Sequence, residues 1–194
     1  MTTEEFQQLQ DEVYAKLNEG LNPHLYYHKV EHTMDVMEQS LRIAIAEGIT
    51  DAHDLLLLKV ACLFHDTGFL VAYKGHEQAS CEILRKRMLN NPFSEEDIQK
   101  MEGMIMSTRI PQSPKTLLEK VICDADLDYL GREDFPIISK RLCDELMALG
   151  RIKTPEEFDQ IQISFFEAHE YWTLTSLSER APVKWIYLQQ LKQV

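Results

Sequence analysis

Apolar residues recur with a helical period along almost the whole chain, and no stretch alternates between apolar and polar residues as a half-buried strand does. Gly and Pro are scarce, at seven each, which also favours helices over a turn-rich β fold. The pattern predicts an all-α fold, a compact bundle of about eight or nine helices in a single domain over residues 1–194. We expect helices at residues 3–19, 26–47, 51–66, 76–89, 94–107, 114–130, 133–149, 154–172 and 174–192, with Asn90 and Asn91 ending the fourth.

The predicted helix at 51–66 is apolar on nearly every side, because it contains the run LLLLKVACLF. A helix without a polar face belongs in the interior, so we expect this one at the centre of the fold. It ends in His65 and Asp66. A buried aspartate is costly unless a cation or hydrogen bonds offset its charge, which makes this pair a candidate metal site.

Two further groups of polar residues can supply ligands. His28 and His32 lie four apart in the predicted helix 26–47, so their imidazoles share one face. The segment CDADLD at 123–128 places three carboxylates two apart in an otherwise apolar helix. A packed histidine and a solvated acidic face are the ordinary interpretations of each group alone. Together, imidazole and carboxylate ligands suit a divalent Mn, Fe, Co, Ni, Zn or Mg ion.

The order of these motifs resembles the HD superfamily of metal-dependent phosphohydrolases. The residues that carry the resemblance are Tyr27-His28 with His32, the run LFHDTGF at 63–69, His76-Glu77 with Ser80, and Asp124 with Asp126. The resemblance covers about residues 25–131 and implies an HD-type helical bundle, which the C-terminal helices at 133–192 complete.

The resemblance implies metal-ligand roles for His32, His65 and Asp66, together with one aspartate of the acidic helix. Residues two apart on a helix point about 200° from each other, so Asp124 and Asp126 cannot meet the same ion. We favour Asp124 as the fourth ligand, with Asp126 as its rival.

We infer the number of bound ions from a difference between this sequence and the family pattern. Two-metal members carry further histidines after the His-Asp pair, whereas no histidine lies between His76 and His169 here. We therefore expect one divalent ion and leave a second open. The same absence counts against a mixed-valent iron oxygenase, a two-metal activity that the superfamily also contains.

Catalytic roles follow from the same resemblance. Asp66 can hold the attacking water as well as the metal, and His76 can donate a proton or orient the substrate. His28 and Glu77 are candidates for orienting the metal-bound groups, because a ligating imidazole needs its second nitrogen fixed.

Phosphate binding requires positive charge, and four residues are candidates for substrate contact. Arg109 lies in a proline-bounded loop directly after a helix, as a pocket rim would. Arg180 and Lys184 are four apart and share a helix face, although a solvated helix surface is the ordinary interpretation of such a pair. His169 belongs to a C-terminal stretch that resembles a bacterial subgroup of these phosphohydrolases.

The net charge of −12 makes a nucleic-acid polymer an unexpected partner, because the chain repels phosphate backbones. A small phosphorylated, nucleotide-like substrate remains compatible if metal ions and local cations offset the repulsion. No apolar stretch approaches the roughly 20 residues of a membrane span, and the first residues lack a signal-peptide core. With four scattered cysteines expected as free buried thiols, we predict a cytoplasmic protein without a membrane partner.

These observations predict hydrolysis of a phosphoester or phosphoanhydride bond by metal-activated water. The alternative is a metal-stabilised helical binding or regulatory module with little turnover. Metal-dependent phosphate release distinguishes the two, and the sequence leaves the substrate, the metal and the oligomeric state open.

Overall fold

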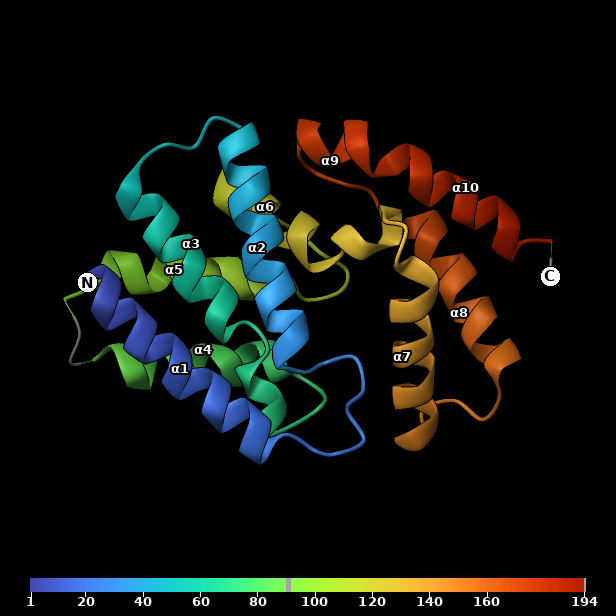
Figure 1. Cartoon of the computed structure of the whole chain (residues 1–194), viewed down its shortest axis with the longest axis horizontal. Helices are drawn as coiled ribbons and strands as arrows, with labels where there is room; N and C mark the ends of the chain where they lie inside the picture. Colours follow the sequence, from blue (N-terminus) through green and yellow to red (C-terminus); the bar gives the residue numbers. More distant parts are fainter. Residues whose placement is uncertain (90–91, 194) are drawn as a thin grey trace.

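The computed structural model describes residues 1–89 and 92–193, and within these ranges the chain forms ten α-helices, two 3₁₀-helices and no strand (Figure 1). The all-α prediction is confirmed, with slightly more helices than expected. None of the described helices is both long and apolar enough to cross a lipid bilayer. The elements are α1 (Thr3–Gly20), α2 (Val30–Ala46), α3 (Ala52–Phe64), η1 (Thr67–Leu70), α4 (His76–Met88), α5 (Glu95–Ser107), α6 (Leu117–Asp126), η2 (Asp128–Gly131), α7 (Phe135–Ala148), α8 (Pro155–Ala168), α9 (Leu174–Glu179) and α10 (Ala181–Leu191).

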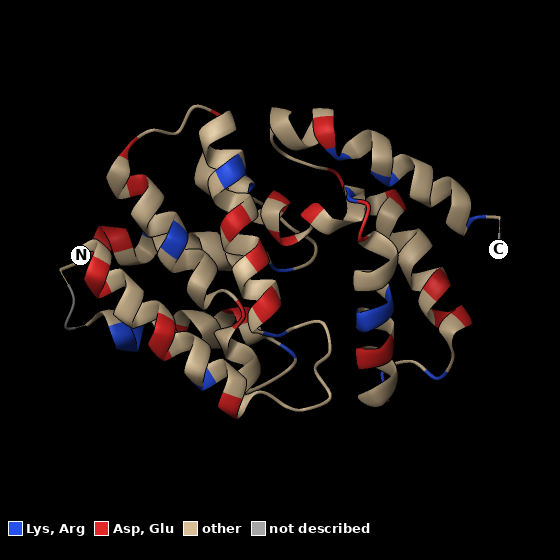
Figure 2. Ribbon diagram, in the orientation of Figure 1, with Lys and Arg blue, Asp and Glu red and all other residues tan. Residues whose placement is uncertain are grey.

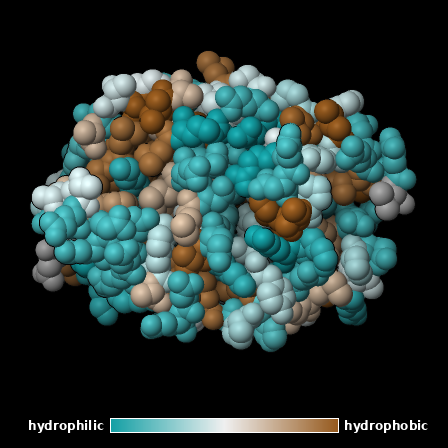
Figure 3. Space-filling view, in the orientation of Figure 1, coloured by the Kyte–Doolittle hydropathy of each residue, from teal (hydrophilic) through white to brown (hydrophobic). Residues whose placement is uncertain are grey.

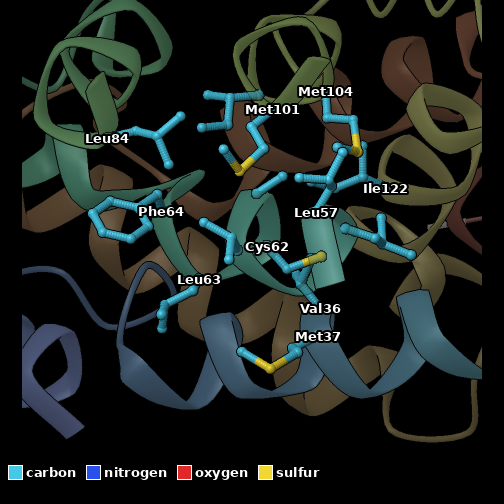
Figure 4. Close-up of a cluster of buried hydrophobic side chains, with 14 of the residues drawn as sticks. Val36, Met37, Leu57, Cys62, Leu63, Phe64, Leu84, Met101, Met104 and Ile122 are labelled. Atoms are coloured by element: carbon cyan, nitrogen blue, oxygen red, sulfur yellow. The ribbon is translucent and has the colours of Figure 1, made fainter. Parts of the chain in front are cut away.

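Helix α3 lies at the centre of the bundle that the first six helices form (Figure 1). Because it is apolar all round, neighbours can enclose it on every side: α2 and α5 pack against it most extensively, and α1, α4 and α6 also contact it. Figure 4 shows Leu57, Cys62 and Phe64 of α3 among side chains from α2, α4, α5 and α6. These three residues are at most 1% exposed, so the expectation of a central helix is confirmed. All four cysteines are free and buried, also as expected.

One expected boundary at the N-terminal side of the site is wrong. Helix α2 begins at Val30, so residues 21–29 form a connecting segment and His28 precedes the helix. A buried carboxylate described below accepts hydrogen bonds from backbone N–H groups of this segment. Asn90 and Asn91, which we expected to end the fourth helix, lie outside the described residues.

The last four helices form a smaller body beside the six-helix bundle (Figure 1). The helix expected at 174–192 is divided into α9 and α10, because Pro182 in the first turn of α10 has no N–H for a helical hydrogen bond. Helix η2 contacts α6, α7 and α10 and so joins the two bodies. Their shared apolar cluster consists of Tyr27, Leu127, Tyr129, Leu130, Phe135, Phe166 and Leu188. The organisation as a single domain over 1–194 stays a prediction.

Asp and Glu (red) are more widespread than Lys and Arg (blue) along the ribbon in Figure 2, in line with the net charge of −12. On the face shown in Figure 3, hydrophobic residues form separate patches within a mostly hydrophilic surface. Any positively charged site must therefore come from specific places in the fold.

Candidate metal centre

Four side chains from three separate helical segments converge between α2, α3 and α6. His32 lies in the first turn of α2, His65 directly follows α3, Asp66 precedes η1, and Asp126 is the last residue of α6. The His32 and His65 Nε2 atoms lie 3.4 Å apart. Asp126 Oδ1 lies 3.0 Å from His32 Nε2 and 3.6 Å from His65 Nε2. Asp66 Oδ2 lies 3.5 Å and 3.3 Å from the same two nitrogen atoms.

The spacing and orientation of these atoms fit a divalent cation. Ligands about 2.1 Å from one ion lie roughly 3.0–3.4 Å apart, close to the distances between these donors. His65 Nδ1 lies 2.8 Å from the carbonyl oxygen of Cys62, which can only accept, so Nδ1 carries a proton and Nε2 is the nitrogen that faces the other donors and could bind an ion once it is deprotonated. Asp66 Oδ2 is buried and has no hydrogen-bond partner among the described residues. An ion would complete the coordination of this oxygen.

The electrostatics of the cluster favour positive charge at its centre. Burial raises the pKa of Asp66, but the neighbouring imidazoles of His65, His28 and His32 outweigh it and hold that pKa well below its usual value. Burial likewise opposes ionisation of Asp126, yet hydrogen bonds from His32 and His65 lower its pKa to about 2. Both carboxylates are therefore ionised at neutral pH, as metal ligands must be.

The expectation that Asp124 faces the imidazoles is wrong, and the rival Asp126 occupies that place. The Asp124 carboxylate points to the opposite side of α6, where it accepts hydrogen bonds from the Trp172 N–H at 2.8 Å, the Thr173 N–H at 2.8 Å and the Thr173 hydroxyl at 2.6 Å. Its burial raises its pKa, and these bonds counter part of that cost. The helix places the two aspartates on opposite faces, and the C-terminal segment decides which one is left for the ion.

His28 is held beside the cluster by Glu145 of α7, a residue that the sequence analysis did not identify. The fully buried Glu145 carboxylate accepts hydrogen bonds from the backbone N–H groups of Tyr27 and His28, at 2.9 and 3.1 Å, and lies 2.5 Å from His28 Nδ1. Burial alone would lower the pKa of His28, but Glu145 and nearby carboxylates raise it. The available signal was the position of Glu145 on the apolar face of the helix expected at 133–149. Its partner His28 lies more than a hundred residues away in the sequence, so the contact itself could not be seen there.

His76 approaches the cluster from the N-terminus of α4. Its Nε2 lies 3.5 Å from Asp66 Oδ1 and 3.7 Å from Glu77 Oε1, while its Nδ1 lies 3.2 Å from the carbonyl oxygen of Tyr73. A Cβ on Gly68 would lie 1.9 Å from the backbone oxygen of His76, so only glycine permits this approach. The structure thus brings His28, His76 and Glu77 to the cluster, as the sequence predicted.

Three of the expected substrate contacts are not brought to the cluster. Arg180 Nε donates to Asp128 Oδ1 at 2.9 Å. Lys184 is buried and donates to the backbone oxygen of His169, with its Nζ 3.1 Å from His169 Nδ1. Burial and the charge of Lys184 lower the pKa of His169 to about 3. Arg180, Lys184 and His169 are thus engaged in contacts within the protein. Arg109, the fourth expected substrate contact, is exposed directly after α5.

A cavity of about 220 Å³ adjoins the cluster, between α7 and α8 on one side and the His-Asp segment on the other. Asp66 and Asp126 line it, and so do His28, His76 and Glu77. A larger groove of about 710 Å³ runs past His32 and is lined by three cationic and four acidic side chains. Since Asp66 and His76 line only the smaller cavity, this cavity is the one that adjoins the candidate chemistry.

Comparison with known proteins places this site in a family. The HD domain family model matches residues 30–128, just over half of the chain, and this range contains His32, His65, Asp66 and Asp126. Neither the comparison with curated proteins nor the comparison with solved structures gives a match. On the family match and the geometry that accompanies it, the chain belongs to the HD domain family.

Proposed function

We propose that the protein is a metal-dependent hydrolase that cleaves a phosphoester or phosphoanhydride bond in a small phosphorylated molecule, with nucleotides as the first class to test. One observation carries the proposal: Asp66 and Asp126 each place an oxygen within 3.6 Å of the Nε2 atoms of both His32 and His65, and Asp66 Oδ2 lacks a hydrogen-bond partner among the described residues. The donor atoms of His32, His65 and Asp66 all lie within 4.8 Å of one another. Membership of the HD domain family, whose members are generally metal-dependent hydrolases, supports it.

The four converging side chains would hold one divalent ion of the Mn, Fe, Co, Ni, Zn or Mg type. When bound, such an ion lowers the pKa of a coordinated water and offsets the charge that develops on phosphorus. The protein's contribution is a rigid set of donors: the carbonyl of Cys62 fixes the His65 ring, and burial restricts the Asp66 side chain.

Proton transfer falls to the residues on the cavity side of the cluster. Asp66 directs Oδ2 towards the imidazoles and Oδ1 towards His76, so Oδ1 can orient the attacking water and accept its proton. His76 can then carry that proton to the leaving oxygen, because the Tyr73 carbonyl fixes its Nδ1 and leaves Nε2 facing the cavity.

His28 provides positive charge beside His76. Phe69 contacts both histidine rings, with ring centroids 4.2 Å from His28 and 4.0 Å from His76, and the two histidine centroids lie 6.3 Å apart. Since Glu145 binds Nδ1 and raises the pKa, the second nitrogen of His28 can donate to a phosphate oxygen. Glu145 acts as a positioning residue in this scheme.

The test is phosphate release from a panel of nucleotides and simple phosphate esters, measured with each candidate metal. His65→Ala and Asp66→Asn should lower kcat by on the order of 10³-fold, because the interactions they remove are worth several kcal/mol in the transition state. His24→Ala is the matched control, since His24 is an exposed histidine outside the cluster. Metal binding without phosphate release from any substrate would contradict the proposal and support the binding-module alternative.

A further inference from the structure

The cavity beside the cluster has one polar end and a long apolar remainder. The polar end is formed by Asp66, Asp126, His28, His76 and Glu77. The apolar remainder is formed by Leu127, Leu130, Leu142, Leu146, Phe158, Ile161, Phe165 and Phe166, with Ile110 at the side of the α5 terminus. A substrate whose phosphate reaches the polar end must place the rest of its body against hydrocarbon.

No lysine or arginine lines this cavity among the residues that the structure describes. Arg180 and Lys184 are engaged with Asp128 and His169. The charged groups at the polar end are two histidines and three carboxylates, which provide no second position for a phosphate. A di- or triphosphate would bury additional negative charge without a cation, which is costly. The lining therefore favours a single phosphate group.

The cavity also offers little for the polar edges of a base or sugar. Thr108 donates its hydroxyl to the backbone oxygen of Ile105 at 2.8 Å, and Gln162 Nε2 donates to Ser139 Oγ at 2.5 Å. Apart from two tyrosines, these are the uncharged polar side chains of the lining. At about 220 Å³, the cavity is smaller than the roughly 300–1,000 Å³ typical of drug-sized ligand sites. A compact body with few polar groups suits these limits.

Resting on the proposed function, we infer that the substrate is a phosphate monoester of a compact apolar alcohol, alkyl or aryl, rather than a nucleotide. Its phosphate lies at the Asp66 and His76 end, and its body lies between α7 and α8. Hydrolysis breaks the phosphorus–oxygen ester bond: R–O–PO₃²⁻ and H₂O give R–OH and HPO₄²⁻. The alcohol oxygen takes one proton of the water, and phosphorus takes its oxygen.

The experiment compares ethyl, butyl, hexyl and phenyl phosphate with AMP and ADP, using the full chain loaded with Mn²⁺. We expect kcat/KM to rise roughly fourfold per added methylene until the chain fills the cavity, and to exceed the value for either nucleotide. Calorimetric binding of ethyl- and hexylphosphonate, which are not hydrolysed, gives a second readout, and the longer chain should bind more tightly.

A matched pair of variants tests whether the preference arises in this cavity. Ile161 lines the cavity and is 51% exposed, whereas Ile186 of α10 is 52% exposed and does not line it. Ile161→Lys should reduce the hexyl-over-ethyl preference by roughly tenfold or more, because it introduces a charge into the apolar wall. Ile186→Lys should leave the preference unchanged.

The outcomes separate this inference from the proposed function. Metal-dependent hydrolysis with equal or better rates on AMP or ADP and no gain with chain length would overturn the apolar-substrate inference and leave the hydrolase intact. Tighter binding of hexylphosphonate without hydrolysis of any ester would contradict the hydrolase and support the apolar ligand class. Loss of the chain-length preference in Ile186→Lys, or its survival in Ile161→Lys, would also overturn the inference.

Discussion

Asp126 and Asp124 both lie at the end of α6, yet their surroundings differ completely. The Asp126 side chain is 16% exposed, and its Oδ1 lies 3.0 and 3.6 Å from the Nε2 atoms of His32 and His65, which can bind a cation when they are deprotonated. Asp124 meets three hydrogen-bond donors from Trp172 and Thr173. Asp66 Oδ2, beside the same imidazoles, has no hydrogen-bond partner among the described residues, whereas both Asp124 oxygens accept hydrogen bonds from the protein. A carboxylate therefore indicates a metal where its neighbours are ring nitrogens that can lose their protons, and not where backbone N–H and hydroxyl groups already satisfy it.

Asp128 extends the comparison to a third aspartate in the same short segment. Its Oδ1 accepts from Arg42 and Arg180, each at 2.9 Å, so this carboxylate pairs with side-chain cations. Removing one arginine leaves the other beside the buried carboxylate, so we expect the largest loss of stability when both are removed. The segment thus supplies one candidate ligand and two anchors that attach the C-terminal body to α6.

The largest expected effect is a difference in hydrolytic activity between variants of Asp126 and Asp124, which lie on opposite faces of α6. Asp126→Asn should lower metal-dependent phosphate release by on the order of 10³-fold, because the amide removes a negative ligand from the cluster. Asp124→Asn should retain most of the activity per folded molecule. Initial rates, normalised to the folded fraction from circular dichroism, provide the measurement, and equal losses in the two variants would contradict the comparison.

Metal binding should stabilise the fold, and this gain should depend on Asp126 but not on Asp124. At a free metal concentration 100 times Kd, the wild type should gain about 2.7 kcal/mol in its free energy of unfolding. Chelation with EDTA should reverse the gain. Asp124→Asn should show the same increment above its own baseline, whereas Asp126→Asn should show almost none. Urea unfolding with and without metal measures both, and a full increment in Asp126→Asn would place the ion elsewhere.

Without metal, Asp124→Asn rather than Asp126→Asn should be the more destabilising substitution. Asp124→Asn should lower the free energy of unfolding by about 2 kcal/mol, because its amide cannot accept all three hydrogen bonds from residues 172 and 173. Asp126→Asn should cost less, because the Asp126 side chain is 16% exposed and an amide oxygen there can still accept the hydrogen bond from His32 Nε2. Urea unfolding in the presence of EDTA tests this, and greater destabilisation by Asp126→Asn would reverse our assignment of the anchor.

The smallest effect concerns pH and the C-terminal body. The pKa of His169 is lowered to about 3 from an ordinary value of 6.5, so between these values the unfolded chain binds the proton and the folded chain does not. His169 alone should therefore lower the free energy of unfolding as pH decreases below 6.5, by about 1 kcal/mol at pH 5.5, whereas His28 and His65, whose pKa values are raised, act in the opposite direction. The difference between the wild type and His169→Asn isolates the contribution of His169. His169→Asn should lose less over this range, and His24→Asn should behave as the wild type. An identical pH dependence in His169→Asn would refute the buried neutral imidazole.

The sequence was informative where chemistry and periodicity coincide. An all-apolar helix ending in His65 and Asp66 predicts both a central position and a charge that needs a partner, and the structure shows both. Gly68 belongs to the same motif, and its backbone approach to His76 explains why glycine is needed there. Such local patterns determine which elements form and which faces are buried.

Features that depend on distant contacts could not be predicted in the same way. The orientation of Asp124 depends on backbone donors at 172 and 173, and nothing near α6 reveals them. The partner of His28 is Glu145 on another helix, and no residue near position 28 in the sequence reveals it. The place of Arg180 and Lys184 depends on how the C-terminal body packs, which periodicity alone does not specify.

The most direct test is the amount of metal bound per chain, measured by elemental analysis after gel filtration of metal-loaded protein. The account predicts close to one ion per chain for the wild type and for Asp124→Asn, and a large loss for Asp126→Asn and for His65→Ala. Full metal content in Asp126→Asn with a loss in Asp124→Asn would contradict the claim that His32, His65, Asp66 and Asp126 form the metal centre.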